Sequence, residues 1–186
     1  MIDFEKARLS HLQAIDSVFS QRDKIEVLVA QVVASLQAGG KVLWCGNGGS
    51  AADAQHMAAE LMVRYVKNRR PLASIALTTD SSLLTAHSND FEFDTVFARQ
   101  VEALAKPGDV LMSLSTSGNS RNVVLAQQQA KDMGCFCVAL TGAKPSALSA
   151  QADLCFQVNS DATARIQEAH ALISHLLCEG LDSHFD

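Results

Sequence analysis

Six consecutive residues near the middle of the chain combine four hydroxyls with a glycine. The segment 115–120 reads Ser-Thr-Ser-Gly-Asn-Ser, and it lies between an apolar run, 109–114, and a helical pattern that begins near Asn122. A helix N-terminus presents free N–H groups and partial positive charge, so it binds anions, phosphate above all. Because the segment has no lysine, it is not a nucleotide P-loop. The pattern predicts a binding site for the phosphate group of a metabolite, in which neutral hydroxyls and amides bind the phosphate without reacting with it. A serine-rich turn that caps a helix is the alternative.

A second glycine-containing loop, 46–51, reads Gly-Asn-Gly-Gly-Ser-Ala and satisfies the dinucleotide fingerprint Gly-x-Gly-x-x-Ala. The acidic residue that should follow about 20 positions later is late, because Asp80 lies 34 positions beyond Gly46. Two helical patterns also precede the first strand. The sequence therefore disfavours a nicotinamide cofactor, and we expect no nucleotide cofactor. The alternative function of the loop is a tight strand–helix turn in which glycine supplies a positive φ.

Two helical segments carry the other side chains that could do chemistry. His56 and Glu60 are four residues apart, so they share one helical face. That spacing allows a shared metal ion or a direct hydrogen bond; an exposed pair of little consequence is the alternative. Gln167 and His175 are eight apart, about 80° around the axis of the C-terminal helix, so both could reach one cleft. For these two the alternative is a pair of satisfied polar groups at an interface. His170 lies nearer the opposite face and is expected to pack or to face solvent.

Length and composition bound the class of protein. The chain has 186 residues, of which 48% are apolar, with a net charge of −5 and a pI near 5.6. One domain with a substantial core is expected, and nucleic acid is disfavoured as a partner. Five cysteines without a Cys-x-x-Cys pair indicate buried free thiols in a reducing compartment rather than a thiolate metal site. The N-terminus has no apolar signal core and no stretch is apolar enough to span a bilayer, so we expect a soluble cytoplasmic protein with no membrane partner.

Short apolar segments alternate with helical patterns along the chain. We expect a single domain, 1–186, in which a helical pair, 1–38, precedes an α/β core, 39–186. The predicted fold is a three-layer α/β sandwich with a five-stranded parallel sheet covered on both faces. Ligands of such sheets bind beyond the carboxyl ends of the strands, so the loops 46–50 and 115–120 are expected to meet at one crevice. Strands are expected at 41–45, 74–77, 110–113, 135–140 and 154–158, and helices at 3–20, 23–38, 51–66, 80–88, 94–104, after the hydroxyl loop as far as 133, and at 163–181.

Taken together, these motifs resemble those of one family, the bacterial phosphoheptose isomerases. The family has the sugar-isomerase (SIS) fold, which is flavodoxin-like, and the likeness runs from about residue 39 to 181, with the two leading helices also matching. The shared motifs, in chain order, are Cys-Gly-Asn-Gly-Gly-Ser at 45–50, His56 with Glu60, Ser-Thr-Ser-Gly-Asn-Ser at 115–120, and Ala-Arg-Ile-Gln-Glu at 164–168 with His175. Each motif alone is weak, but their joint occurrence in this order is specific.

The resemblance implies a reaction and a set of substrate contacts. The family converts sedoheptulose 7-phosphate to D-glycero-D-manno-heptose 7-phosphate, an entry step to activated heptose for lipopolysaccharide or other surface glycans. By resemblance, the phosphate is held by Ser115, Thr116, Ser117 and Ser120. The sugar would be contacted by Asn47, Gly48, Gly49, Ser50, Glu60, Asn89, Asp90 and Gln167. For the Asn-Asp pair the sequence offers no independent argument, and a simple turn is the alternative.

The expected chemistry suits the residues present. Aldose–ketose isomerisation moves a proton between C1 and C2 through an enediol, so it needs a base at carbon and an acid near the two oxygens. Glu60 is the natural catalytic base and His175 the natural catalytic acid. A glutamate works best here when burial raises its pKa toward neutrality. No redox cofactor is needed, which agrees with the poor nicotinamide fingerprint.

The resemblance also implies one zinc ion per subunit and a homo-oligomer. The family's zinc ligands match His56, Glu60, Gln167 and His175; imidazoles and a carboxylate are ordinary zinc ligands, whereas an amide oxygen is less usual. A zinc-bound Glu60 is a poorer base, and a bound His175 is not a free acid. The metal therefore either polarises the sugar oxygens or serves the structure and releases these residues. The family forms tetramers with sites between subunits, and the unpaired N-terminal helices are compatible with that.

Other functions and two departures from the family pattern stay open. Ala164 stands where some members have an acid, and the loop 142–146 lacks a Gly-Gly pair, which leaves the exact sugar phosphate undecided. Related proteins that have lost the catalytic pair act as protein-interaction modules, including one that binds the replication initiator. Because Glu60 and His175 are both present here, the sequence favours the isomerase over such a module. A phosphosugar sensor, which binds its ligand without proton exchange, is a further alternative.

Overall fold

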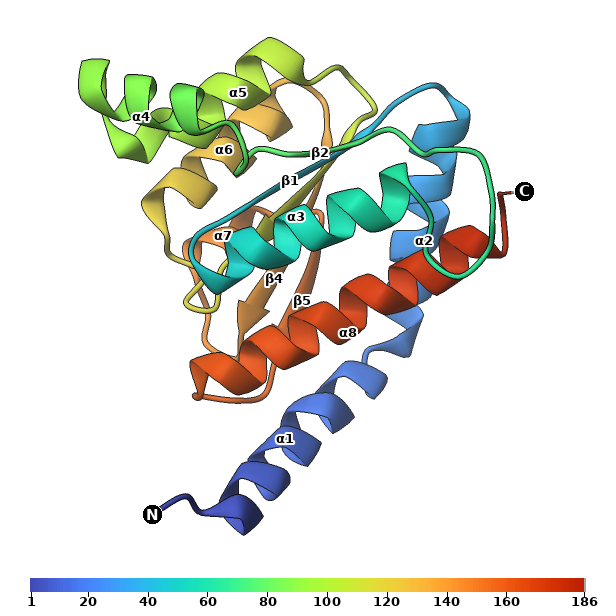
Figure 1. Ribbon diagram of the computed structural model, residues 1–186, viewed down its shortest axis with the longest axis vertical. Coiled ribbons are helices and arrows are strands. Elements are labelled where there is room, and N and C mark those ends of the chain that lie inside the picture. The colour runs from blue at the N-terminus through green and yellow to red at the C-terminus, as the bar shows by residue number, and fades with distance from the viewer. Residues whose placement is uncertain (186) are drawn as a thin grey trace.

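Five short apolar segments form the parallel sheet at the centre of the computed structural model, which describes residues 1–185 (Figure 1). The strands are β1 (Val42–Gly46), β2 (Ser74–Ala76), β3 (Val110–Leu114), β4 (Phe136–Gly142) and β5 (Leu154–Val158). All neighbouring strands pair in parallel, in the order β2-β1-β3-β4-β5. The strands β1 and β3 are buried along their whole length, as expected of parallel strands with both faces covered. The predicted five-stranded parallel sheet is confirmed.

The order of the strands locates the place where a ligand would bind. From β1 the chain moves outward to β2, and it then returns to β3 on the other side of β1. In open parallel sheets a crevice forms outside the carboxyl ends of two such strands. Because Gly46 at the end of β1 pairs with Leu114 at the end of β3, the loops 46–50 and 115–120 leave the sheet at the same level. The prediction that both loops meet at one edge of the sheet is confirmed.

Helices cover both faces of the sheet. One face carries α2 (Arg22–Gln37), α3 (Gly49–Met62) and α8 (Thr163–Asp182), and α3 and α8 lie side by side there (Figure 1). The other face carries α5 (Val96–Leu104), α6 (Arg121–Asp132) and the short α7 (Ala147–Gln151). Alternation along β1 divides the core between them, because Val42 and Trp44 pack toward the first group while Leu43 and Cys45 pack toward the second. The three-layer arrangement follows from this division.

The first helix, α1 (Phe4–Phe19), packs against α8 and β5 but extends away from the rest of the molecule (Figure 1). Asp3 caps its N-terminus by accepting a hydrogen bond from the Lys6 N–H at 2.9 Å. Only Ala14 and Val18 of this helix are buried. Its remaining apolar side chains are largely exposed: Phe4 77%, Leu9 54%, Leu12 42% and Phe19 54%. The helix therefore presents an apolar face that this chain alone does not cover.

Several boundaries differ from the predicted ones. The helix α3 ends at Met62, although the pattern predicted a helix as far as Val66. A 3₁₀ turn, η1 (Phe93–Thr95), lies between α4 (Ser81–Asp90) and α5, and α7 was not predicted. The 20-residue α8 places polar side chains on its exposed side. Within residues 1–185, no helix combines the length and the apolar character that crossing a bilayer requires.

A buried ion pair fixes the segment that follows α3. Asp182, in the last turn of α8, accepts hydrogen bonds from the N–H groups of Val66 (3.0 Å) and Lys67 (2.9 Å) and from Nε of Arg69 (2.8 Å). The guanidinium of Arg69, which is fully buried, also donates to the carbonyl groups of Glu60 and Leu61 at 3.0 Å. The pair ties the C-terminal end of α3 to that of α8. It also explains why α3 stops early, since the N–H groups after it bond to α8 instead.

The five cysteines are free thiols. Four of them are buried and Cys155 is partly buried. Burial raises the pKa of the Cys45, Cys137 and Cys178 thiols to about 12, and that of Cys135 to about 11. These thiols are therefore protonated and unreactive at neutral pH, as the sequence predicted for buried free cysteines.

Candidate active site

The hydroxyl loop 115–120 joins β3 to α6, as predicted. Its side chains form a small cluster in which Oγ of Ser115 lies 2.9 Å from Oγ of Ser120 and 3.4 Å from Oγ of Ser117. The loop closes at Gly118, whose φ of +67° and close approach to Ser146 leave no room for a side chain. Ser120 is the N-cap of α6, yet its side chain makes no capping hydrogen bond. The first N–H groups of α6 are therefore not satisfied by that side chain, which is the condition for binding an anion there.

The glycine loop is fastened to the hydroxyl loop by a reciprocal pair of amides. Nδ2 of Asn47 donates to Oδ1 of Asn122 at 2.8 Å, and Nδ2 of Asn122 donates back to Oδ1 of Asn47 at 2.9 Å. Asn122 lies in the first turn of α6 and was not among the predicted site residues. Gly48 has a φ of +57° and precedes α3, as the interpretation of a tight glycine turn predicted. Ser50 is buried and packs beneath the loop against Gly46.

Gln167 lies against the beginning of α3. A Cβ built at Gly49 would come within 2.3 Å of Nε2 of Gln167, so only glycine leaves room for this amide. The side chain thus lies beside the glycine loop, at the crevice end of α8. Along α8 it is eight residues, about 12 Å, from His175. Sequence spacing predicted that both could reach one cleft, and in the structure Gln167 lies in the second turn of α8 while His175 lies about two turns further along the helix.

The predicted base and acid meet where α3 packs against α8. Nε2 of His56 lies 3.0 Å from Oε1 of Glu60 on the same helix. The ring of His175 on α8 lies 5.2 Å from the ring of His56, in an edge-on contact. On its other side His175 stacks against Tyr65, with 5.7 Å between ring centroids. Half of the His56 side chain and about a quarter of the Glu60 side chain are exposed, so this group is open to a ligand.

Asp53 joins this group and was missed by the sequence analysis. Burial raises the pKa of its carboxyl group, and the nearby imidazoles of His56 and His175 oppose that shift. Its Oδ2 is buried and has no hydrogen-bond partner. A signal was present in the sequence, because Asp53, His56 and Glu60 follow one another at spacings of three and four residues on one helical face.

Other histidine and asparagine residues lie apart from this group. His170 is fully buried and approaches the carbonyl oxygen of Thr141 through Nε2 at 3.3 Å; its burial lowers the pKa of the imidazole to about 4, so the ring is neutral. It packs, as one of the two predicted alternatives had it. Asn89 and Asp90 end α4, where Nδ2 of Asn89 donates to Oδ1 of Asp90 at 2.9 Å. This helix packs against α5 and η1 at one end of the molecule, whereas α8 packs against α1, α2 and α3 (Figure 1).

The donor set at the α3–α8 contact can be tested against the zinc ion implied by the family. Two imidazoles and a carboxylate are the ligands that zinc prefers, and the partnerless buried oxygen of Asp53 adds a fourth group of suitable chemistry. Across residues 1–185, no three His, Cys, Asp or Glu side chains are placed closely enough to hold a metal ion as they stand. The residue types fit zinc, and side-chain rotation would be needed to bring their donor atoms to one point.

The fold and the site define a known class. A family model for the SIS domain matches residues 7–142, so the chain belongs to the SIS domain family. It is 50% identical to the phosphoheptose isomerase of Helicobacter hepaticus over 94% of this chain and 89% of that one. It is 56% identical to the phosphoheptose isomerase of Rhodospirillum rubrum over 79% of this chain and 78% of the relative.

Solved structures agree. The structure of phosphoheptose isomerase GmhA from Neisseria gonorrhoeae matches with a TM-score of 0.90 at 40% identity, covering 96% of each chain. A phosphoheptose isomerase from Francisella tularensis matches with a TM-score of 0.89 at 36% identity, covering 98% of this chain and all of that one. The resemblance and the fold class drawn from the sequence are confirmed.

Proposed function

We propose that this protein isomerises sedoheptulose 7-phosphate to D-glycero-D-manno-heptose 7-phosphate through an enediol, for the synthesis of activated heptose used in lipopolysaccharide or another surface glycan. One observation carries the proposal: Glu60 of α3 and His175 of α8 both contact His56, and α3 begins at the glycine loop against which Gln167 of α8 packs. Relatives that are 50% and 56% identical over most of the chain bear the name of this isomerase, which supports the reaction and the substrate.

In the proposed mechanism the phosphate is bound by the hydroxyl loop. Ser115, Ser117 and Ser120 present hydroxyls within one small cluster, and the first turn of α6 presents N–H groups. None of these groups is activated as a nucleophile by a neighbouring base, so the phosphate serves only to anchor the substrate. The carbon chain then extends past Gly49 and Gln167 toward the α3–α8 contact.

Proton transfer belongs to the residues at that contact. Glu60 removes the proton from the carbon next to the carbonyl group and returns it to the neighbouring carbon. His175 supplies a proton to the carbonyl oxygen and accepts one from the hydroxyl as the enediol collapses. The stacked ring of Tyr65 and the edge of His56 hold the His175 imidazole from two sides. The carboxyl group of Asp53 lies close enough to the imidazoles of His56 and His175 to interact with both electrostatically.

A zinc ion is part of the proposal. It would be held by His56, Glu60, Gln167 and His175, and it would either supply Lewis-acid polarisation of the sugar oxygens or serve the structure and release Glu60 and His175 for proton transfer. The donor types support this assignment, since two imidazoles and a carboxylate are ordinary zinc ligands. We expect one zinc per subunit by elemental analysis, and its removal by a chelator should lower the unfolding temperature. Full retention of activity and stability in zinc-free protein would remove the metal from the proposal.

The test of the reaction is an NMR assay of sedoheptulose 7-phosphate in D₂O. Wild-type protein should interconvert the two sugar phosphates and exchange hydrogen at C1 or C2. Glu60→Gln and His175→Ala should each lower kcat by a factor of about 10² to 10⁴, the usual contribution of a positioned acid or base. Glu26→Gln and His184→Ala, which alter exposed residues that are not among the proposed site residues, are the matched controls. Binding without hydrogen exchange would establish a phosphosugar sensor or a non-catalytic interaction module instead.

We also propose that the protein works as a homotetramer. The exposed apolar face of α1 supports association with a second copy. So does the position of Asn89 and Asp90 on α4, which packs against α5 and η1, because a neighbouring subunit could bring this pair to the α3–α8 contact. Light scattering at micromolar concentration should give four times the chain mass. A monomer that is fully active would contradict both the assembly and the shared site.

A further inference from the structure

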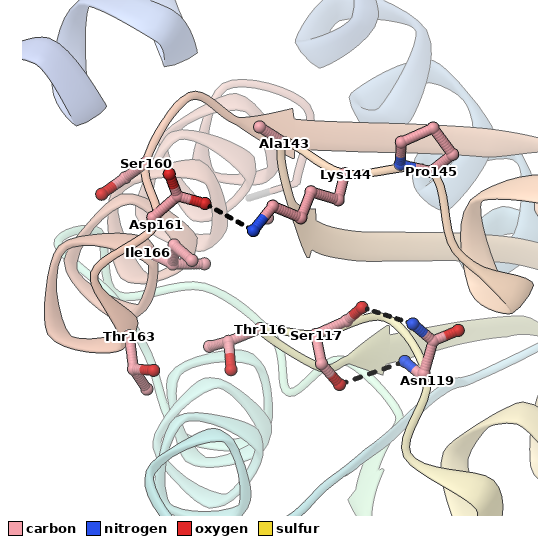
Figure 2. A pocket seen from close by; sticks show the side chains of 11 residues that line it. Thr116, Ser117, Asn119, Ala143, Lys144, Pro145, Ser160, Asp161, Thr163 and Ile166 are labelled. Carbon is pink, nitrogen blue, oxygen red and sulfur yellow. Dashed lines mark hydrogen bonds and ion pairs between the residues drawn. The ribbon is translucent and has the colours of Figure 1, made fainter.

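A pocket of about 380 Å³ lies on the outer side of the hydroxyl loop (Figure 2). It is bounded by Thr116 and Ser117 of that loop, by the segment after β4, and by the segment that leads into α8. Gly142 holds these parts together, since its N–H donates to the carbonyl oxygen of Thr116 at 3.0 Å and a Cβ there would clash with that oxygen. The pocket is thus built onto the predicted phosphate site.

Opposite charges face each other across the rim of this pocket. Lys144, from the loop after β4, pairs with Asp161, from the loop after β5, through a 3.0 Å contact between Nζ and Oδ1 (Figure 2). Of the residues that line the pocket, they are the only cation and the only anion. Both side chains are more than 80% exposed, so the pair adds little to stability and can open easily.

The hydroxyl loop has no cation of its own, although a phosphate monoester carries close to two negative charges at neutral pH. Hydroxyls and backbone N–H groups solvate such an anion but do not neutralise it. An ammonium group on a flexible stem is a common phosphate partner, because it binds as a point charge without a fixed direction. Lys144 is the cation that this pocket offers for the purpose.

We propose that Lys144 is a phosphate-recognition residue, which leaves Asp161 and pairs with the phosphate of the substrate when the hydroxyl loop is occupied. This inference rests on the proposed function of the loop. Asp161 opposes it, both by holding Lys144 in the free protein and by repelling a dianion. The ligand class is a phosphate monoester. Lys144 and Asp161 set the affinity for the charged phosphate group and take no part in proton transfer.

The experiment measures KM and kcat for sedoheptulose 7-phosphate, together with the calorimetric Kd of inorganic phosphate, for four variants. Lys144→Met should raise both KM and the phosphate Kd about tenfold, the value of one charge-assisted hydrogen bond, with a smaller change in kcat. Lys144→Arg should restore both within about threefold, because it keeps the charge. Asp161→Asn should lower both constants about threefold. The control Lys131→Met removes the same charge from an ion pair at the far end of α6 and should change neither constant.

The outcomes separate this inference from the proposed function. If wild-type protein turns over the sugar phosphate while Lys144→Met keeps wild-type KM and phosphate Kd, the inference is wrong and the isomerase stands. If wild-type protein shows no turnover but Lys144→Met still weakens phosphate binding, the isomerase is wrong and the inference stands. A tenfold increase in KM and in the phosphate Kd for Lys131→Met as well would mean that the effect comes from the net charge of the protein, and it would overturn the inference. Weaker binding in Asp161→Asn would contradict the opposing role of that carboxylate.

Discussion

Replacing Asp182 by alanine should show how strongly the packing of α3 against α8 depends on one buried ion pair. The substitution removes the acceptor of three hydrogen bonds, from Val66, Lys67 and Arg69. It also leaves the Arg69 guanidinium fully buried without its counter-ion. Loss of one partner of a buried pair costs about 3–5 kcal/mol. Because Arg69 keeps its carbonyl partners at Glu60 and Leu61, we expect the lower figure, about 3 kcal/mol.

That magnitude is measurable by urea and by thermal unfolding. For a chain of this length, 3 kcal/mol corresponds to a fall of about 6–12 °C in Tm. Glu102→Gln is the matched control, since it breaks an exposed pair with Arg99 and should change the free energy of unfolding by less than about 0.5 kcal/mol. A double variant, Arg69→Met with Asp182→Leu, should be less destabilised than either single variant, because no uncompensated charge stays buried.

The pH dependence provides an independent check. Burial alone would raise the pKa of Asp182, but hydrogen bonds from the Lys67 and Val66 N–H groups and from Arg69 outweigh it and hold the pKa below its ordinary value. The stabilisation is therefore complete well above pH 3.8, the value for an unperturbed aspartate, and is lost as the pH falls below it. The difference between wild type and Asp182→Ala should shrink between pH 5 and pH 3. A single-variant loss below 1 kcal/mol at pH 7, or a difference that is constant with pH, would refute the reasoning.

Three further outcomes follow from single positions. Burial lowers the pKa of His170 from 6.5 to about 4, so the unfolded chain takes up a proton at a higher pH than the folded protein does. The free energy of unfolding should therefore fall by roughly 3 kcal/mol as the pH drops from 6.5 to 4. His170→Leu should remove most of that pH dependence in urea titrations at several pH values. Gly49→Ala would place a Cβ 2.3 Å from Nε2 of Gln167, so turnover should fall at least tenfold. The Tm should change by less than about 3 °C. An unchanged kcat/KM would show that the Gln167 amide can move away at no cost. Gly118→Ala combines a positive φ with a Cβ 2.1 Å from Oγ of Ser146. Chemical unfolding should therefore show that the free energy of unfolding falls by at least about 2 kcal/mol. A smaller decrease would mean that the loop relaxes freely.

Local patterns were sufficient for most of the fold. The strands are short and mostly apolar segments, and β1 and β3, which are buried along their whole length, have the composition of parallel strands covered on both faces. The end of α3 was misplaced because residues 63–66 continue a helical pattern, while the N–H of Val66 is taken by Asp182, 116 residues away. A contact so distant along the chain leaves no trace in a local window. The five-residue α7 escaped because a single turn has too few positions to show a period.

The site was predicted unevenly for a similar reason. Residues on one helix were found by spacing, as with His56 and Glu60, and the meeting of α3 with α8 was available only through the family resemblance. Asp53 was overlooked because an aspartate in a helix is usually exposed, and only the structure shows that one of its oxygens is buried beside two imidazoles. Asn122 was overlooked because its partner, Asn47, is 75 positions distant.

The buried thiols allow local and global unfolding of the protein to be measured by cysteine labelling. A thiol with a pKa near 12 has almost no thiolate at pH 7.5, so an alkylating reagent reacts with it mainly when the surrounding structure opens. Cys45 and Cys137 lie in β1 and β4, the strands on either side of the central β3, whereas Cys178 lies in α8, three residues beyond His175. Labelling rates at these positions, compared with and without a phosphosugar, would therefore distinguish unfolding of the whole chain from local opening of α8, without any introduced probe.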